Sequence, residues 1–211
     1  MKALKLVAAV CALGVSPVLA GDWTYSGGVL TDGNWSIAAS HKSGSITVGA
    51  PTAGSGLLDL SKPCSSGTIS AVGGSAFAGN TNITELVLPD RSFTIGTYAF
   101  QNCSNLKGKL SLGKVGRVTF SYSGGQRDSW TFQNTGIEDL EIGYIGNTVN
   151  SVYGFSKGVF SGCTSLTNIT FTENCDIAEF GKNVFDGCTA LKTVTPLLPE
   201  TVKDINPILV S

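Results

Sequence analysis

Few residues in this sequence could do chemistry: a single histidine, a set of cysteines and one short run of carboxylates. His41 stands between Ser40 and Lys42 in a turn-like segment. One histidine cannot hold zinc without several other ligands, and the sequence contains no Gly-x-Ser-x-Gly turn that would present a nucleophilic serine. We therefore expect no catalytic residue, no metal ion and no cofactor. We expect that the protein is not an enzyme, and a secreted enzyme is the weakest of three functional hypotheses.

The one cluster of carboxylates comprises Glu138, Asp139 and Glu141. The surrounding residues alternate between apolar and polar, as in a strand with one buried face, and this alternation turns Asp139 and Glu141 outward. The pattern favours a solvated protein surface. A calcium contact is the alternative, because carboxylate oxygens are the ligands that calcium prefers.

Cysteine is the residue type whose spacing is most regular. Five cysteines follow the first twenty residues, namely Cys64, Cys103, Cys163, Cys175 and Cys188. Three of them come three residues after a phenylalanine, which indicates equivalent positions in a repeat. A buried thiol that packs as a small apolar group is the favoured interpretation. A metal site or a disulfide between Cys163 and Cys188 is the alternative.

The phenylalanines before these cysteines identify an internal repeat, which is the first feature to look for in any sequence. Clear copies span residues 76–83, 99–106, 159–166 and 184–191, and a degenerate copy spans 131–137. Successive anchor phenylalanines are 23, 32, 28 and 25 residues apart. Each copy runs into a short alternating strand, such as Leu86-Val87-Leu88. One such unit cannot bury its own apolar face, whereas stacked units can.

The sequence therefore predicts a mainly β solenoid of about five turns, with short helical turns between its strands. Stacking should place like residues on like residues. The predicted repeat core comprises Phe77, Phe100, Cys103, Leu106, Phe132, Phe160, Cys163, Leu166, Phe185, Cys188 and Leu191.

Residues 95–106, 160–166 and 198–205 together carry a family resemblance. Their sequences, IGTYAFQNCSNL, FSGCTSL and LPETVKDI, resemble the BspA-type leucine-rich repeats of bacterial secreted and surface proteins. The resemblance covers about residues 69–205. It implies a leucine-rich-repeat solenoid with a role in protein interaction or adhesion, and it implies no shared catalytic residues. The alternative is a structural, self-assembling surface protein.

Residues 1–20 have the organisation of a secretory signal peptide. Lys2 and Lys5 precede a ten-residue apolar run, and small residues lead to a predicted cleavage site between Ala20 and Gly21. The run is about half the length needed to span a bilayer, and no later stretch is longer, so we expect no transmembrane segment. The protein should be exported and should lie outside the cell, on its surface or in the periplasm.

Residues 21–68 lack the repeat and contain short alternating segments around a Thr31–Asn34 turn signal. They predict an N-terminal β-rich cap, and residues 69–211 then form the solenoid, with an incomplete last repeat. Solenoids need such a cap to cover the open core. Trp23 and Trp35 should pack inside it, with stacking on a sugar ring as the alternative.

The predicted partner is a protein or a surface glycan, and self-association through the open C-terminal end is the further expectation, because unpaired strand edges invite pairing. Nucleic acid is not expected, because the net charge is −1 and no basic patch is evident. Outward strand positions are polar and poor in the aromatic and arginine anchors of tight interfaces. An insertion at 113–128 is richer. The candidate partner-binding residues are Arg117, Phe120, Tyr122, Arg127 and Trp130.

Overall fold

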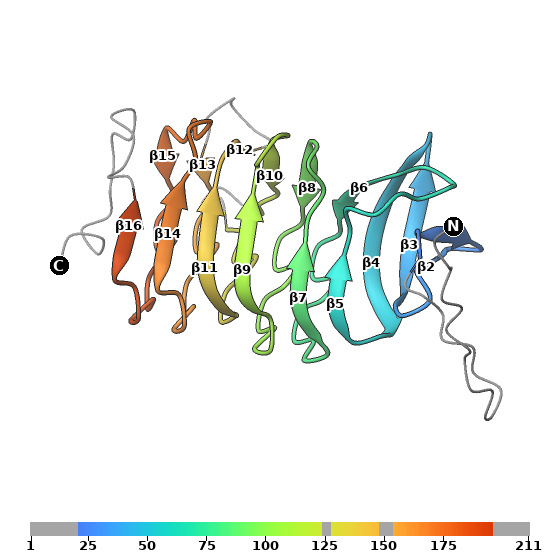
Figure 1. The fold of residues 1–211 in the computed structure, drawn as a ribbon, viewed down its shortest axis with the longest axis horizontal. Coiled ribbons are helices and arrows are strands. Elements are labelled where there is room, and N and C mark those ends of the chain that lie inside the picture. Colours follow the sequence, from blue (N-terminus) through green and yellow to red (C-terminus); the bar gives the residue numbers. More distant parts are fainter. Residues whose placement is uncertain (1–20, 124–127, 148–153, 196–211) are drawn as a thin grey trace, which may run out of the picture.

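The computed structural model describes residues 21–123, 128–147 and 154–195, and its regular elements within these ranges are all strands (Figure 1). The strands are β1 (Thr24–Ser26), β2 (Val29–Thr31), β3 (Ser36–Lys42), β4 (Ser45–Ala53), β5 (Gly56–Asp59), β6 (Thr68–Val72), β7 (Ile83–Val87), β8 (Phe93–Ile95), β9 (Lys107–Leu112), β10 (Val118–Phe120), β11 (Gly136–Ile142), β12 (Ile145–Asn147), β13 (Gly154–Phe155), β14 (Asn168–Phe171), β15 (Glu179–Phe180) and β16 (Thr193–Thr195).

The chain winds as a solenoid whose coils add strands to two faces. One face carries β5, β7, β9, β11, β14 and β16 in order, and we call it the strand face (Figure 1). The second face carries β4, β6, β8, β10 and β12, followed by the pair β13 and β15. Pairing between coils is parallel, with a register shift in three of the ladders, and Leu140 of β11 lies beside Leu110 of β9 and Ile169 of β14. The predicted solenoid of about five turns is confirmed.

The segments that join the two faces are turns. Where we predicted short helical turns, the described residues contain no helix. Single hydrogen bonds between residues three apart close these segments, as from the Asn80 amide to the Phe77 carbonyl (2.9 Å) and from Cys103 to Phe100 (3.2 Å). Each turn then donates to the next coil, as from Phe77 to Ala99 (2.7 Å). Coil-to-coil bonds thus replace the bonds that would have extended a helix.

The anchor phenylalanines form a continuous column through the core. The ring centroids are separated by 5.1 Å for Phe77–Phe100, 5.2 Å for Phe100–Phe132, 5.5 Å for Phe132–Phe160 and 5.7 Å for Phe160–Phe185. The rings are within 8° of parallel. Trp35 covers the first ring edge-on, at 6.3 Å and 84°. Such ring pairs add about 0.5–1.5 kcal/mol each beyond their burial.

The cysteines of the repeat lie beside this column as free thiols. Each thiol donates to the phenylalanine carbonyl of the preceding coil: Cys103 to Phe77 (3.0 Å), Cys163 to Phe132 (3.1 Å) and Cys188 to Phe160 (3.2 Å). In the degenerate coil Thr135 stands near this position, and its hydroxyl donates to the Phe132 carbonyl of its own coil over 3.0 Å. Burial raises the pKa of the Cys103 thiol to about 12. This position of the repeat therefore favours a small side chain that can donate one hydrogen bond to a backbone carbonyl.

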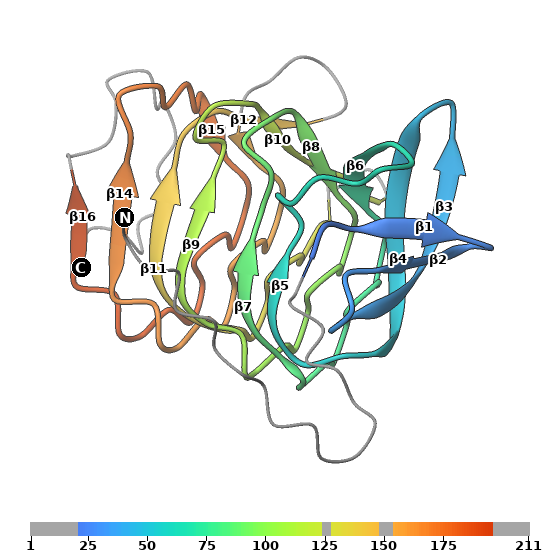
Figure 2. The ribbon, with the colours of Figure 1, turned by 45° about the vertical axis from the view of Figure 1, so that its right-hand side comes forward.

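The N-terminal end of the stack is closed by antiparallel strands β1 to β4 (Figure 2). Trp23 and Trp35 are at most 1% exposed, so they pack within this end and offer no face to a sugar. Parallel stacking starts earlier than the expected boundary at residue 69. β4 already pairs with β6 from Ser45, and β5 pairs with β7 from Gly56. The cap and the first coil therefore share strands.

The segment 113–128, which we interpreted as an insertion, contains a regular strand of the second face. β10 pairs in parallel with β8 and β12, and Val118 and Phe120 are buried. The additional residues come after Phe120, where Ser123 and Asp128 exchange two backbone hydrogen bonds (2.9 and 3.2 Å). In the four clear copies an apolar residue stands five positions before the anchor phenylalanine, but in the degenerate copy Arg127 stands there, so the strand was not predicted.

Candidate binding face

The residues predicted to contact a partner do not form a free surface. Phe120 is fully buried in the core, so its candidacy as a contact residue is wrong. Arg117 reaches across the coils, donating to the Ile145 carbonyl (2.7 Å) and to the Asp176 carboxylate (2.5 Å). Its guanidinium also lies 5.7 Å from the centroid of the Tyr144 ring. Arg117 therefore holds neighbouring coils together.

The other three candidates are placed differently. Trp130 is half-buried, and its ring lies against the backbone of Gly158, where an added Cβ would come within 2.2 Å of the ring. Lys157 covers the ring at 5.6 Å from its centroid. Tyr122 is half-buried, and Arg127 lies outside the described residues.

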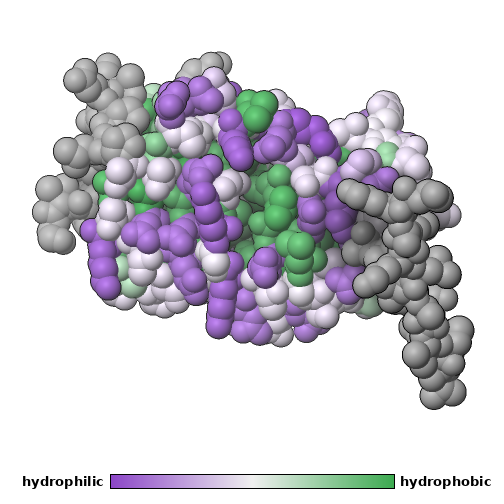
Figure 3. Space-filling model, in the orientation of Figure 1, coloured by the Kyte–Doolittle hydropathy of each residue, from purple (hydrophilic) through white to green (hydrophobic). Residues whose placement is uncertain are grey.

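The strand face presents the outward side chains of six strands. Glu85 and Val87 of β7, Thr170 of β14 and Thr193 of β16 are all exposed. Apolar colour gathers over β7 in Figure 3, where Val87 is 41% exposed and its neighbour Leu57 of β5 is 43% exposed. The remaining outward positions are small polar or charged. The face thus combines an apolar patch with polar rows.

The strand face is interrupted once among the described strands. No ladder joins β7 to β9, although they belong to successive coils, and we call this gap the seam. The two buried positions at the start of β9 are one residue farther apart than the equivalent positions in the other coils. In four coils three steps separate the two buried slots, as from Ile83 to Leu86, but four steps separate Leu106 from Leu110. Gly108 accommodates the extra residue with a left-handed φ of 71°, a conformation that glycine adopts without steric cost.

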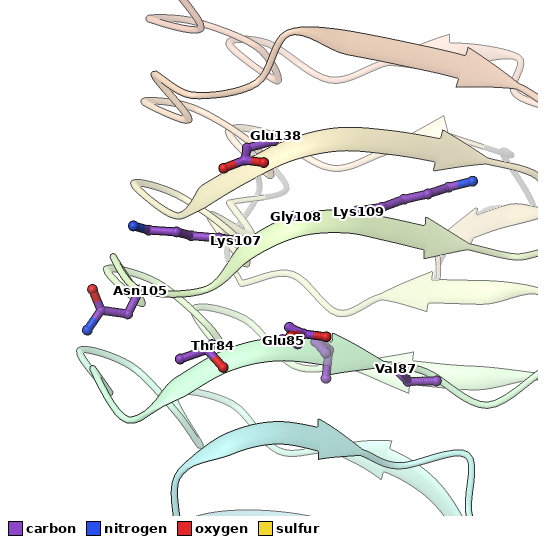
Figure 4. Close-up of a pocket in the computed structure, with 9 residues that line it drawn as sticks. Thr84, Glu85, Val87, Asn105, Lys107, Gly108, Lys109 and Glu138 are labelled. Carbon is purple, nitrogen blue, oxygen red and sulfur yellow. The ribbon is translucent and has the colours of Figure 1, made fainter.

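The seam is hollow along its length. A cavity of about 390 Å³ is lined by Thr84, Glu85, Leu86, Val87, Asn105, Lys107, Gly108, Lys109 and Glu138 (Figure 4). A second cavity of about 280 Å³ shares Leu86, Val87 and Lys109 with the first and continues to Asp90 and Lys114. The two form one furrow between β7 and β9. The larger lies within the size range of small-ligand sites.

The walls of the furrow carry charges of both signs. Lys109 forms an ion pair with Glu141, whereas Glu85, Lys107 and Glu138 form none with any other described residue. In Figure 4 the Glu85 side chain lies along β7, and the two lysines of β9 point to opposite sides. Unpaired charges of both signs therefore face solvent around a glycine.

The carboxylate run of β11 does not converge on a metal. Glu141 binds Lys109, and Asp139 accepts a hydrogen bond from the Asn168 amide (2.6 Å). In the described part of the chain no group of three or more potential ligands could hold a metal ion. These contacts instead tie β11 to the strands on either side of it.

Residues 70–209 match the BspA type leucine rich repeat region, in six copies. The chain belongs to this family. No curated protein matches it. Two solved structures are similar: a leucine-rich repeat protein from Bacteroides ovatus (14% identity, 80% of this chain and 53% of the other, TM-score 0.36) and a leucine rich cell surface protein from Faecalibacterium prausnitzii (18%, 81% and 55%, TM-score 0.36). The chain thus spans about half the length of each.

Two further observations bear on this BspA-type protein. Among the residues that the structure describes, no helix is long and apolar enough to cross a membrane. The seam residues Lys107 and Gly108 were not among the candidates taken from the sequence, and Glu138 was considered only as a member of the carboxylate cluster. A signal for them exists, because the extra residue between Leu106 and Leu110 can be counted once the repeat is aligned.

Proposed function

We propose that this BspA-type protein is an exported interaction or adhesion module of the cell surface, which binds a partner protein through its strand face without catalysis. The observation that carries the proposal is the strand face itself, where outward side chains from β5 to β16 lie in parallel rows on either side of the seam. Repeat proteins bind partners through such extended surfaces. The family membership supports an interaction role, and the signal-like segment 1–20 supports export.

The partner is a protein and not a free glycan, because the exposed part of this face is poor in aromatic rings on which sugars stack. Its apolar patch at Leu57 and Val87 can pack against a partner side chain. The polar rows around the patch form the rim that a typical protein interface shows. The scattered hydroxyl groups and the charges of both signs favour specific hydrogen bonds and ion pairs with the partner over a general attraction to opposite charge.

Binding of the chain 21–211 to extracellular-matrix and cell-surface proteins, measured by surface plasmon resonance, tests the proposal. Val87→Arg should weaken binding at least about fivefold, because a buried apolar contact at an interface centre is worth about 1 kcal/mol or more. Lys42→Glu, on an exposed position of the cap, is the matched control and should leave binding unchanged. Equal binding by both variants would exclude the strand face.

Export has its own test, because a surface protein must leave the cytoplasm. Expression of the full chain in a bacterial host, followed by N-terminal sequencing of the secreted or periplasmic form, should give Gly21 as the first residue. A product that stays in the cytoplasm with its N-terminus intact would contradict export. Light scattering over a range of concentrations then separates a monomeric binding module from a self-assembling surface protein.

A further inference from the structure

We propose that Cys163 and Cys188 form a disulfide bond in the exported protein, which ties together the last two coils that the structure describes. The structure holds both cysteines as free, buried thiols. Disulfides form and persist in the oxidising compartments that exported proteins enter. The supply of an oxidant rests on the proposed export. The bond itself lies inside the stack and not on the strand face, so it is independent of partner binding.

Backbone hydrogen bonds beside the pair fix the distance between the two coils. The Phe160 amide donates to the Val184 carbonyl over 2.9 Å, and the Gly162 amide donates to the Asp186 carbonyl over 2.6 Å. The two phenylalanine rings that stand three residues before the cysteines are stacked 5.7 Å apart. Backbones paired in this way are about 5 Å apart. A disulfide spans roughly 4.4–6.8 Å between its Cα atoms, so the two coils are close enough for one.

The two thiols lie side by side between these backbones. Cys163 donates to the Phe132 carbonyl over 3.1 Å, and Cys188 donates to the Phe160 carbonyl over 3.2 Å. The two cysteine side chains are also in hydrogen-bond contact with each other. Equivalent positions on adjacent coils and direct contact of the side chains mean that the bond needs rotation of the thiols and no movement of a coil.

Oxidation leaves no buried carbonyl without a donor. The Phe132 carbonyl also accepts hydrogen bonds from the amide and the hydroxyl of Thr135, over 3.3 and 3.0 Å. The Phe160 carbonyl also accepts one from the Cys163 amide over 3.2 Å. Both acceptors keep a partner when the thiols lose their hydrogens. The bond therefore forms without the penalty that a buried, unsatisfied acceptor would add.

The bond forms by exchange with an external disulfide, either oxidised glutathione or a thiol–disulfide oxidoreductase. Before its coil docks, the Cys188 thiolate attacks one sulfur of the external disulfide, which gives a mixed disulfide and releases one thiolate. Docking brings the Cys163 thiolate to this mixed disulfide, where it attacks the Cys188 sulfur and releases the second thiolate. The protein gives up two protons and two electrons, and the external disulfide is reduced to two thiols.

The chain contains two cysteines that serve as controls for this pairing. Cys103 also stands three residues after an anchor phenylalanine, but the corresponding residues are Asn80 in the coil before it and Thr135 in the coil after it. Its thiol donates to the Phe77 carbonyl over 3.0 Å. Cys175 is half-buried and lies between the paired cysteines in sequence. Neither control should join the bond.

Peptide mapping identifies the bond in the parent chain without a substitution. The chain 21–211 is refolded with oxidised glutathione, alkylated and digested with trypsin and a glutamyl endopeptidase, which cleaves after Glu173 and so separates Cys163 from Cys175. Mass spectrometry should find peptide 158–173 joined to peptide 183–192, two hydrogen atoms lighter than their sum. Alkylation of both paired cysteines, or a bond from either of them to Cys175, would overturn the inference.

Thermal unfolding measures what the bond does. Reductant should lower the unfolding midpoint of the oxidised parent by about 4 °C or more, because the bond restrains the unfolded chain. Cys163→Ser and Cys188→Ser should show the same midpoint with and without reductant. Cys103→Ser makes the same substitution at an equivalent buried position and should keep the response of the parent. A parent midpoint that reductant does not change would overturn the tie between the coils.

Partner binding separates this inference from the proposed function. Cys163→Ser should bind a partner protein as tightly as the parent chain, because Cys163 is buried beneath the surface and is not part of the strand face. Formation of the bond in a chain whose strand-face variants do not alter binding overturns the proposed function alone. Binding through the strand face by a chain that never forms the bond overturns this inference alone.

Discussion

At the outer edge of β5, the first strand of the strand face, and again at the seam, one side of a parallel strand lacks a hydrogen-bonded partner strand. The side chains around these two edges differ. At the outer edge of β5 the Leu57 carbonyl accepts from the Trp35 indole (2.8 Å) and the Asp59 carbonyl from the Trp23 indole (2.7 Å). The Asn34 amide donates to the Ser55 carbonyl over 2.8 Å. At the seam, charged and apolar side chains border β7 and no ladder closes it.

The comparison shows that side chains alone can satisfy the backbone carbonyls of a strand edge when the donors are spaced like every second residue of the strand. The capped carbonyls lie two residues apart and point the same way, because alternate backbone groups of a strand share a direction. Each indole also buries a large ring against the core. An edge closed in this way cannot template pairing with another chain, whereas at the seam no ladder and no such side-chain donor joins β7 to β9 among the described residues. The predictions below test whether the two edges differ in stability as they differ in structure.

Trp35→Ala should have the largest effect. The change removes a ring that is 1% exposed, its edge contact with Phe77 and the indole donor to Leu57. Large-to-small changes of this kind cost about 3–5 kcal/mol. Urea denaturation followed by circular dichroism measures the loss in unfolding free energy. A loss below about 1 kcal/mol would show that the cap is not what closes this end.

Trp23→Phe tests the hydrogen bond separately from the ring. Phenylalanine keeps most of the buried apolar surface but cannot donate to the Asp59 carbonyl. A buried acceptor left without its donor costs about 1–3 kcal/mol. Thioflavin fluorescence after prolonged incubation should rise at the same time, because the exposed edge of β5 can then pair with another chain. Unchanged stability would mean that water replaces the indole.

The repeat and the packing of both tryptophans could be predicted from the sequence, because spacing and residue type determine which side chains stack. The carbonyl partners of the indoles could not be predicted. Trp23 and Asp59 are 36 residues apart, and the pairing depends on how the cap folds over β5. β10 was missed for a different reason. A loop separates Phe120 from its anchor Phe132, so counting at fixed spacing led to Arg127 instead.

Gly108→Ala should have a smaller effect, on the seam side of the comparison. The glycine has a φ of 71°, and an L-residue held in this left-handed region costs about 1–2 kcal/mol. No atom lies within 4 Å of the added Cβ, so strain in the backbone is the whole expected cause. Thermal unfolding measures the decrease. Gly79→Ala in the first repeat turn is a matched control, since Gly79 has a φ of 72° and an equally open Cβ position.

A decrease in Gly108→Ala equal to that in Gly79→Ala would show that the left-handed backbone at Gly108 is only a local conformation. A much smaller decrease would show that β9 relaxes, because nothing pairs with it on the seam side. The second result would sharpen the contrast with β5, whose edge is fixed by three side-chain donors. The comparison of two glycines with nearly identical φ therefore reports how firmly the seam holds β9.

Lys109→Ala should have the smallest effect. Lys109 extends from the seam strand to Glu141 on β11, the side on which β9 is already paired. The lysine is 56% exposed on its side chain, and exposed ion pairs contribute about 0–1 kcal/mol that salt screens further. Urea denaturation at low and high salt should show a loss of less than about 1 kcal/mol that shrinks as the salt concentration rises. A larger, salt-independent loss would mean that Lys109 supports the wall of the seam through its methylene groups, and that β9 depends on this contact because its other edge is open.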